Sequence, residues 1–373
     1  MNNIKIYLLL TLSILLYSCS SKKEIGKGTT QNQIKNDNSA FNGANKLLIG
    51  ATLNYNDLYS QKGKLYLKDF KYLTTANEAK QPKIHPQPNV WNWKEIDEIV
   101  QFANTNKLAV RLHGPISPQA SKWAKEDSRT AQELENNLVE FATAFAKHFN
   151  NEPSVKWMDV VNETVLGNGD WFGPLPGTNE WENPWLKMGL DENGYPLYIL
   201  KAFEIATKNA TNIKLVYNQH VGLETEMWDK VKRTVLYLRS KGYRVDGIGW
   251  QAHLLMGAKR QDFVDNTDAT MLKLANLIDW AHQNKLAFHV TELDYLVKDT
   301  TVLEAERLIQ KRVYQKLVDV LLEKSKNGEV TLNLWDMGER SKDGLGSFQS
   351  IYDSNLNPTP AYSVIKEAIE KSK

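Results

Sequence analysis

Apolar runs of strand length alternate with amphipathic segments along most of this 373-residue chain, and this alternation restricts its fold more than any other feature. Eight runs have the length and composition of buried strands. They cover residues 47–53, 69–75, 108–114, 155–163, 213–218, 247–254, 286–293 and 330–337. Nearly continuous apolar runs are typical of parallel strands that are buried on both faces.

Helical patterns follow the strands along the chain. They cover residues 93–106, 128–149, 197–208, 226–242, 270–285 and 302–327, with a last helix after Pro358. Ser128 is the predicted N-cap of the second of these helices. Strands that alternate with helices in this way predict an α/β fold, the (β/α)8 TIM barrel. An open doubly wound sheet would favour a glycine-rich phosphate loop after the first strand, and no such loop follows residues 49–52.

The first 19 residues resemble a bacterial lipoprotein signal peptide. A short region with Lys5 precedes an apolar run from Ile6 to Tyr17, and Cys19 follows, so cleavage before Cys19 would leave a lipid-bearing cysteine. The run is shorter than the roughly 20 residues that a membrane span needs. An ordinary secretory signal or an anchor helix is the alternative. We expect a lipid-anchored protein of the cell envelope, on the outer membrane, facing the periplasm or the surface.

Residues 20–45 are poor in apolar side chains and predict a flexible tether, so the catalytic barrel is expected to span residues 46–373. Cys19 is the sole cysteine, which excludes an internal disulfide. The net charge of +2 implies no nucleic-acid partner. We expect a monomer.

Polar side chains stand where most of the predicted strands end. They are His113, Asn162, Glu163, Tyr217, Asn218, Gln251, His253, Glu292, Asp294, Trp335 and Asp336. A single one of them is more often structural. In a TIM barrel, however, the carboxyl ends of the strands form one rim that carries the chemistry, so their convergence predicts an active site.

Two of these residues, Glu163 and Glu292, suit the cleavage of an acetal. They end the fourth and seventh strands, which face each other across a barrel, and this permits the carboxyl separation of about 5–5.5 Å that retaining enzymes use. His253 and Asp294 would keep Glu292 ionised as the nucleophile, and Glu163 would stay protonated as the acid. Asn162 could bind a sugar hydroxyl. The alternative is that both glutamates pair with lysines.

Metal chemistry is not predicted. The seven histidines show no HxH or HExxH spacing, and His289 is expected to point from its strand into the helix layer. No phosphate loop, nucleophile elbow or CxxC motif is present, so no cofactor is expected.

Several segments resemble glycoside hydrolase family 10, the retaining xylanase family, over residues 47–370. WMDVVNET resembles the strand of its acid/base, HVTELDY that of its nucleophile, and FKYLTTANEAK, GIGWQAHL and LNLWDMGERS resemble further motifs in the same order. The resemblance implies that Glu163 is the acid/base and Glu292 the nucleophile. It implies that Asn77, Lys80, His113, Asn162, Gln251 and Trp335 contact the substrate, and that His253 and Asp294 orient Glu292. His253 is also expected to contact the substrate, and so is Asn218, because of its position at the end of a strand.

The sequence departs from this family at the sugar-binding wall. Ser117 and Pro118 stand where a Trp and a His are usual, Ala76 replaces an acidic residue, and the Trp expected shortly after Trp335 is missing. Residues 167–189 form a longer loop with Trp171, Phe172, Trp181 and Trp185, either a self-packed cap or a new sugar platform. The expected function is therefore a retaining β-glycosidase with xylan as its default polysaccharide, an endo-1,4-β-xylanase. The alternative is a lipid-anchored glycan-binding protein of the same fold.

Overall fold

The computed structural model describes residues 46–177, 181–220, 222–256, 259–342 and 344–373. The predicted signal peptide and tether, including Cys19, lie outside the described residues. By its internal contacts the chain divides into Met1–Asn38 and Ser39–Lys373. The second unit holds every described residue, and the hydrophobic core described below is built within it. Within the described part, no helix is long and apolar enough to cross a membrane.

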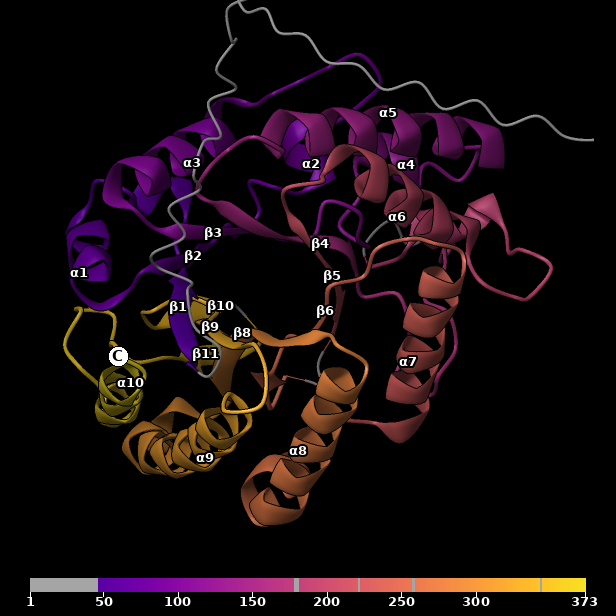
Figure 1. Ribbon diagram of the computed structural model, residues 1–373. Coiled ribbons are helices and arrows are strands. Elements are labelled where there is room, and N and C mark those ends of the chain that lie inside the picture. The colour runs from indigo at the N-terminus through magenta and orange to yellow at the C-terminus, as the bar shows by residue number, and fades with distance from the viewer. Residues whose placement is uncertain (1–45, 178–180, 221, 257–258, 343) are drawn as a thin grey trace, which may run out of the picture. The chain divides into compact units, whose positions relative to one another are not determined.

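Eight parallel strands form a closed barrel, which confirms the predicted fold (Figure 1). They are β1 (Leu48–Thr52), β2 (Tyr72–Thr74), β3 (Ala109–Leu112), β4 (Val155–Asn162), β5 (Lys214–Gln219), β6 (Gly247–Trp250), β8 (Ala287–Val297) and β9 (Val330–Leu334). The barrel closes because β9 pairs with β1, with Thr331 opposite Leu48.

Helices surround the barrel (Figure 1). They are α1 (Gln61–Asp69), α2 (Gln81–Ile84), α3 (Lys94–Asn106), α4 (Lys122–Lys125), α5 (Ala131–Phe149), α6 (Leu197–Asn209), α7 (Thr225–Ser240), α8 (Thr267–Gln283), α9 (Leu303–Lys324) and α10 (Pro360–Lys371). The sequence did not predict α1, α2 or α4. The predicted cap of α5 was wrong, because Thr130 rather than Ser128 forms the N-cap, in a capping box with Glu133.

The core has two parts. Strand residues that face the helices join the main hydrophobic core, whereas Tyr72, Ala109, Trp157 and Val216 fill the interior of the barrel. The His289 side chain lies in this interior. Its ring is 6.0 Å from that of Trp157 across the barrel, and its Nδ1 is 2.9 Å from Thr331 Oγ1. The prediction that His289 faces the helices was therefore wrong, because the alternation of β8 places it on the inner face.

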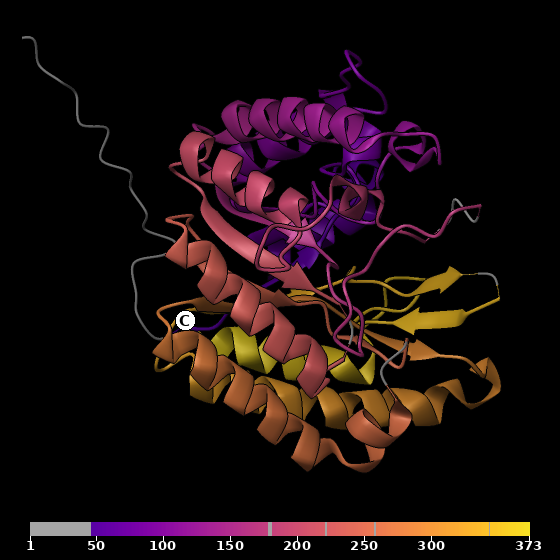
Figure 2. The same cartoon turned by 90° about the vertical axis from the view of Figure 1, so that its right-hand side faces the viewer.

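A short additional sheet extends the barrel at its carboxyl rim. The strand β8 runs on beyond its neighbours and pairs with β11 (Gly346–Gln349), which pairs in turn with β10 (Arg340–Lys342). On its other side, β7 (His253–Leu254) pairs with β8. In Figure 2 the β10–β11 hairpin extends at the right, and the C-terminus lies on the opposite side.

Candidate active site

Glu163 follows directly after β4 with a backbone φ of +56°, a conformation that residues other than glycine rarely adopt. The register of β4 against β5 shifts by one residue between Asp159 and Val161, so a bulge turns Asn162 and Glu163 inward. Glu163 Oε1 accepts hydrogen bonds from Gln251 Nε2 at 2.6 Å and Asn162 Nδ2 at 3.1 Å. Its Oε2 is buried, and no described residue bonds to it.

Glu292 lies on β8 within a second bulge, where the register against β9 shifts between Val290 and Leu293. Its carboxylate is buried and contacts three polar groups: His253 Nε2 is 3.1 Å from Oε2, and Asn218 Nδ2 and His113 Nε2 are 3.2 and 3.6 Å from Oε1. Burial by itself would raise the pKa of this carboxyl. The positive charges of His113, His253 and Lys80 outweigh it and lower the pKa of Glu292 to about 2.

His253 connects Glu292 to Asp294, as the sequence predicted, because its Nδ1 lies 2.9 Å from Asp294 Oδ1. Burial would lower the pKa of this imidazole. The carboxylates of Asp294 and Glu292 outweigh that effect and raise the pKa of His253 to about 10. At neutral pH the ring is therefore protonated and donates to both carboxylates, which favours an ionised Glu292.

Asn162 and Asn218 link the two glutamates. Asn162 bonds to Glu163, and Asn162 Oδ1 accepts from Asn218 Nδ2 at 2.9 Å, while that same nitrogen donates to Glu292. Asn218 is fully buried, and its Oδ1 accepts from Thr291 Oγ1 at 2.9 Å. The structure therefore places Asn218 behind the reacting groups, where it positions them.

His113 belongs to a second layer of charges inside the barrel. Its Nδ1 lies 3.1 Å from Asp159 Oδ2, and Arg111 forms an ion pair with Asp159 Oδ1. Arg111 Nε also donates to the Tyr72 hydroxyl at 2.6 Å. These groups are buried, so contacts inside the barrel fix the position of His113 beside Glu292.

Lys80 and Trp335 are neighbours at the carboxyl rim. Lys80 is buried, bonds to Gln119 Oε1, and has its ammonium 5.9 Å from the centre of the Trp335 ring. Burial lowers the pKa of Lys80. The Trp335 ring meets the His113 ring edge to face at 5.1 Å. The side chain of Asn77 is exposed.

Two of the rim residues lie outside the cleft. Tyr217 faces the helices, where its hydroxyl lies 2.5 Å from Thr164 Oγ1 and its ring stacks on Phe203 at 6.0 Å. Asp336 pairs with Lys62 at 2.7 Å. No ion pair joins Glu163 or Glu292 to a lysine within the described residues, so the alternative of two lysine-paired glutamates loses its support.

The loop at 167–189 packs mainly against the protein itself. Trp185 is fully buried, and its indole donates to the Ser117 carbonyl at 3.1 Å. Phe172 is also buried, and Trp171 donates to the Gly194 carbonyl at 3.1 Å. Trp181, 48% exposed, is the open aromatic of the four. Residues 178–180 lie outside the described residues, so the loop is described on either side of them.

Sequence reasoning missed several groups around the site. Asp159 and Arg111 are charged residues within apolar strands, and that contrast is a signal that could have identified them. Arg340 contacts Asp294 at 2.7 Å from a hairpin that the sequence did not predict. His220 is half-buried beside Glu163; burial lowers its pKa, and the charge of Glu163 acts against this.

In the described part of the chain, no group of three or more His, Cys, Asp or Glu side chains has the arrangement of a metal site. What the cleft does offer is two unequal carboxylates. Glu292 is ionised and held by hydrogen-bond donors, whereas Glu163 lies next to neutral amides and has one oxygen to which no described residue bonds. This inequality is what acid catalysis combined with nucleophilic attack requires.

The profile of glycosyl hydrolase family 10 matches residues 37–368. The chain belongs to glycosyl hydrolase family 10. It is similar to endo-1,4-beta-xylanase B of Thermotoga neapolitana, with 27% identity over 82% of each chain. It is also similar to endo-1,4-beta-xylanase A of Caldicellulosiruptor saccharolyticus, with 28% identity over 85% of this chain and 92% of that protein.

Solved structures agree with this assignment. Xylanase 10B of Thermotoga petrophila in complex with xylobiose superposes with a TM-score of 0.73 and 25% identity, covering 87% of this chain and 94% of the other. Native xylanase 10B of Thermotoga maritima gives 0.72 and 26%, over 87% and 95%. This family 10 chain is therefore a glycoside hydrolase of the endo-xylanase type.

Proposed function

We propose that this family 10 protein is a retaining endo-1,4-β-xylanase that works by double displacement. The observation that carries the proposal is the inequality of the two carboxylates. Glu292 accepts hydrogen bonds from a protonated His253 and from Asn218, which favours the ionised form. Glu163 accepts hydrogen bonds from the neutral amides of Gln251 and Asn162, and its other oxygen has no hydrogen-bond partner among the described residues.

The two roles follow from these environments. In the first step, Glu292 attacks the anomeric carbon while Glu163 donates its proton to the leaving glycosidic oxygen, and a covalent glycosyl ester forms. In the second step, the Glu163 carboxylate takes a proton from water, which attacks the same carbon and releases Glu292. Two inversions give net retention. The carboxyl separation of about 5–5.5 Å remains a prediction for a structure with bound sugar.

The sugar on the glycone side would lie over Trp335 and within reach of Lys80 and Asn77. An indole offers a flat apolar surface, and the ammonium and amide offer donors for sugar hydroxyls. The sugar at the cleavage point would contact four further residues: His113, Asn162, Gln251 and His253. All four belong to the network of polar groups around the two glutamates. Xylan is the favoured polysaccharide because the relatives above are named as xylanases.

A lipid-anchored glycan-binding protein without hydrolysis is the second candidate. The absence of the usual aromatic and imidazole groups at Ser117 and Pro118 favours it. A binding protein, however, does not need a buried, ionised Glu292.

A reducing-sugar assay on a panel of β-glycans, with Glu292→Ala as the control, separates the two. Turnover of xylan well above the control supports the hydrolase, and proton NMR of the first product then reports retention. Binding with turnover equal to the control on every glycan would leave the second candidate ahead.

The lipid anchor at Cys19, the outer-membrane location and the monomeric state are further parts of the proposal. The anchor and the location rest on the signal-like first 19 residues and the polar segment at 20–45. Metabolic labelling with a fatty-acid analogue tests the anchor, with Cys19→Ala as control. Labelling that persists in the control would contradict it.

A further inference from the structure

Basic residues stand at the amino end of nearly every barrel strand. Because the eight strands are parallel, these ends meet at one face, opposite the cleft, which we name the basal face. Its basic residues are Lys46 before β1, Lys71 before β2, Lys107 before β3, Lys156 in β4, Lys214 in β5, Arg244 before β6 and Lys285 before β8. Acidic residues stand directly before two of the strands, Asp246 before β6 and Glu329 before β9. The whole chain has a net charge of only +2, so this face concentrates positive charge.

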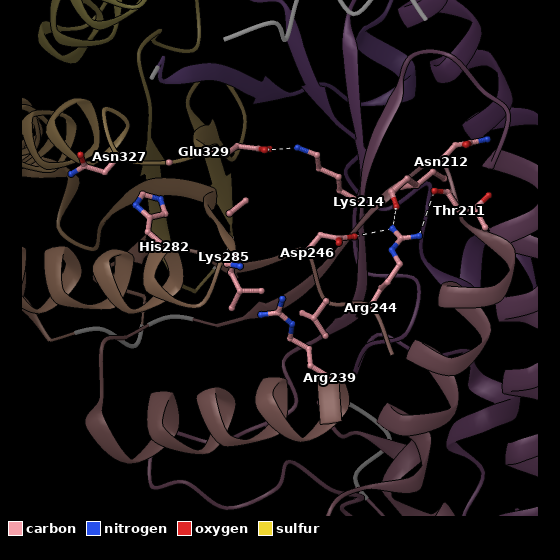
Figure 3. Close-up of a pocket in the computed structure, with 15 residues that line it drawn as sticks. Thr211, Asn212, Lys214, Arg239, Arg244, Asp246, His282, Lys285, Asn327 and Glu329 are labelled. Atoms are coloured by element: carbon pink, nitrogen blue, oxygen red, sulfur yellow. Dashed lines mark hydrogen bonds and ion pairs between the residues drawn. The ribbon is translucent and has the colours of Figure 1, made fainter. Parts of the chain in front are cut away.

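A polar pocket of about 500 Å³ opens on this face between the starts of β5, β6, β8 and β9 (Figure 3). Its two carboxylates already have partners. Asp246 pairs with Arg244 at 2.8 Å, and Glu329 accepts from the Trp157 indole at 2.9 Å and pairs with Lys214.

Two cations of the pocket keep their charge available. The Arg239 guanidinium donates one bond, to the Asn284 carbonyl at 2.6 Å, which holds it beside Lys285. Within the described chain, no carboxylate lies within ion-pair distance of Arg239 or Lys285, and both are exposed. The same holds for Lys71 and Lys107 outside the pocket. A fixed guanidinium with free N–H groups next to an ammonium matches a phosphate group.

The position of the basal face, at the start of the barrel, indicates which surface it would contact. The described chain enters the barrel at Lys46, directly before β1 and therefore on the basal face. Residues 20–45 separate Lys46 from Cys19, and a coil of that length spans on average about 25–30 Å. A lipid on Cys19 would thus hold the basal face near a bilayer, with the cleft directed away from it.

We infer that the basal face docks on a bilayer that carries anionic phospholipid headgroups, and that the pocket between Arg239 and Lys285 receives a headgroup phosphate. The inference adds a second contact to the proposed lipid anchor, and it orients the cleft toward the surroundings. It rests on the proposed location at a membrane, but not on the identity of the sugar substrate.

The test uses residues 39–373, the compact unit that holds the barrel, so that neither a lipid nor the apolar leader contributes. Sedimentation measures binding to vesicles of phosphatidylglycerol with phosphatidylcholine and to vesicles of phosphatidylcholine alone. We expect binding to the anionic vesicles only, and weaker binding at high salt. Xylan turnover of the bound protein should stay within about twofold of the free protein, because the cleft faces away.

Two triple variants with the same change in charge locate the surface. Lys71→Gln/Lys107→Gln/Lys285→Gln should lower binding about a hundredfold, at roughly fivefold for each basic residue near the surface. Lys64→Gln/Lys122→Gln/Lys298→Gln removes three exposed lysines near the carboxyl rim and should change binding by less than about fivefold. Equal losses in both, or no preference for anionic vesicles, would overturn the inference.

A double variant tests the pocket. Arg239→Gln/Lys285→Gln should lose more binding than Lys71→Gln/Lys107→Gln, and equal losses would remove the pocket from the proposal. The binding readout needs no catalysis. A protein that binds vesicles but leaves xylan intact would therefore contradict the proposed function alone, and the reverse result would contradict this inference alone.

Discussion

Arg340 and Asp294 form an ion pair, with 2.7 Å between Nη2 and Oδ2, although they come from different strands of the sheet at the carboxyl rim. The other oxygen of Asp294 contacts His253, which contacts Glu292. Alternating charges thus run from the β10–β11 hairpin to the proposed nucleophile. Arg340 helps to position Asp294, His253 and Glu292 without contacting the reacting atoms. Mutations can test its role and the roles of four further groups.

Removing the charge of Arg340 should affect catalysis through Asp294. In Arg340→Met the Asp294 carboxylate loses its ion-pair partner, so Asp294 and His253 are held less firmly and His253 orients Glu292 less well. We expect kcat/KM to fall about tenfold, equivalent to about 1.4 kcal/mol, and the acidic limb of the pH profile to move to higher pH. Arg340→Lys keeps the charge and should restore most of the activity. A lysine variant as impaired as the methionine variant would argue for a purely steric role.

The stability of the protein should depend on His253 at alkaline pH. The pKa of His253 in the folded state, about 10, lies above its ordinary value of 6.5. Its contribution to the free energy of unfolding is therefore complete below about pH 6.5 and is lost as the pH rises through 10. Urea midpoints measured from pH 6 to 10 should fall in the wild type. His253→Gln should be less stable at pH 6 and show a flatter decline, and an unchanged slope would count against a protonated His253.

Glu163→Gln should discriminate between leaving groups. A xylan or xylo-oligosaccharide leaving group needs a proton, so its turnover should fall by about 10²–10⁴-fold. An aryl xyloside with an acidic phenol needs little protonation and should be slowed far less in the first step. Steady-state and burst kinetics on both substrates provide the measurement. Equal slowing of both would transfer the acid role to another group.

Gly249 leaves room for the side-chain amide of Asn218, because it has no side chain of its own. A Cβ at this position would lie 2.2 Å from Asn218 Oδ1, so alanine would displace the amide that donates to Glu292. Gly249→Ala should lower kcat by at least tenfold while the circular dichroism spectrum is retained. Asn218→Ala should have a similar effect, and the double variant should be little worse than either single one. Additive losses would mean that the two residues act independently.

Trp185 and Trp181 distinguish a cap from a platform. Because Trp185 is fully buried, Trp185→Ala should lower the free energy of unfolding by about 3–5 kcal/mol. Trp181 is 48% exposed, so Trp181→Ala should leave stability within about 0.5 kcal/mol. If Trp181 binds sugar, this variant should raise KM for long xylo-oligosaccharides and leave short aryl xylosides unaffected. Unchanged KM for every chain length would make the loop a cap only.

The sequence alone determined the barrel and the rim on which the reaction takes place. Apolar strands separated by amphipathic helices have few ways to bury both faces, and parallel strands place their carboxyl ends together. Glu163, Glu292, His253 and Asp294 could therefore be placed in one site from their positions at strand ends, and the structure does bring them together.

Only the tertiary structure decided in which direction these side chains point and which groups they contact. The bulges in β4 and β8 depend on register against neighbouring strands, and each turns a glutamate inward. The inward direction of His289, the buried bridge through Asn218 and the ion pair of Arg340 depend likewise on segments far apart in the chain. Side-chain periodicity records which residues are buried, but the direction and partner of a buried polar group depend on what packs against it.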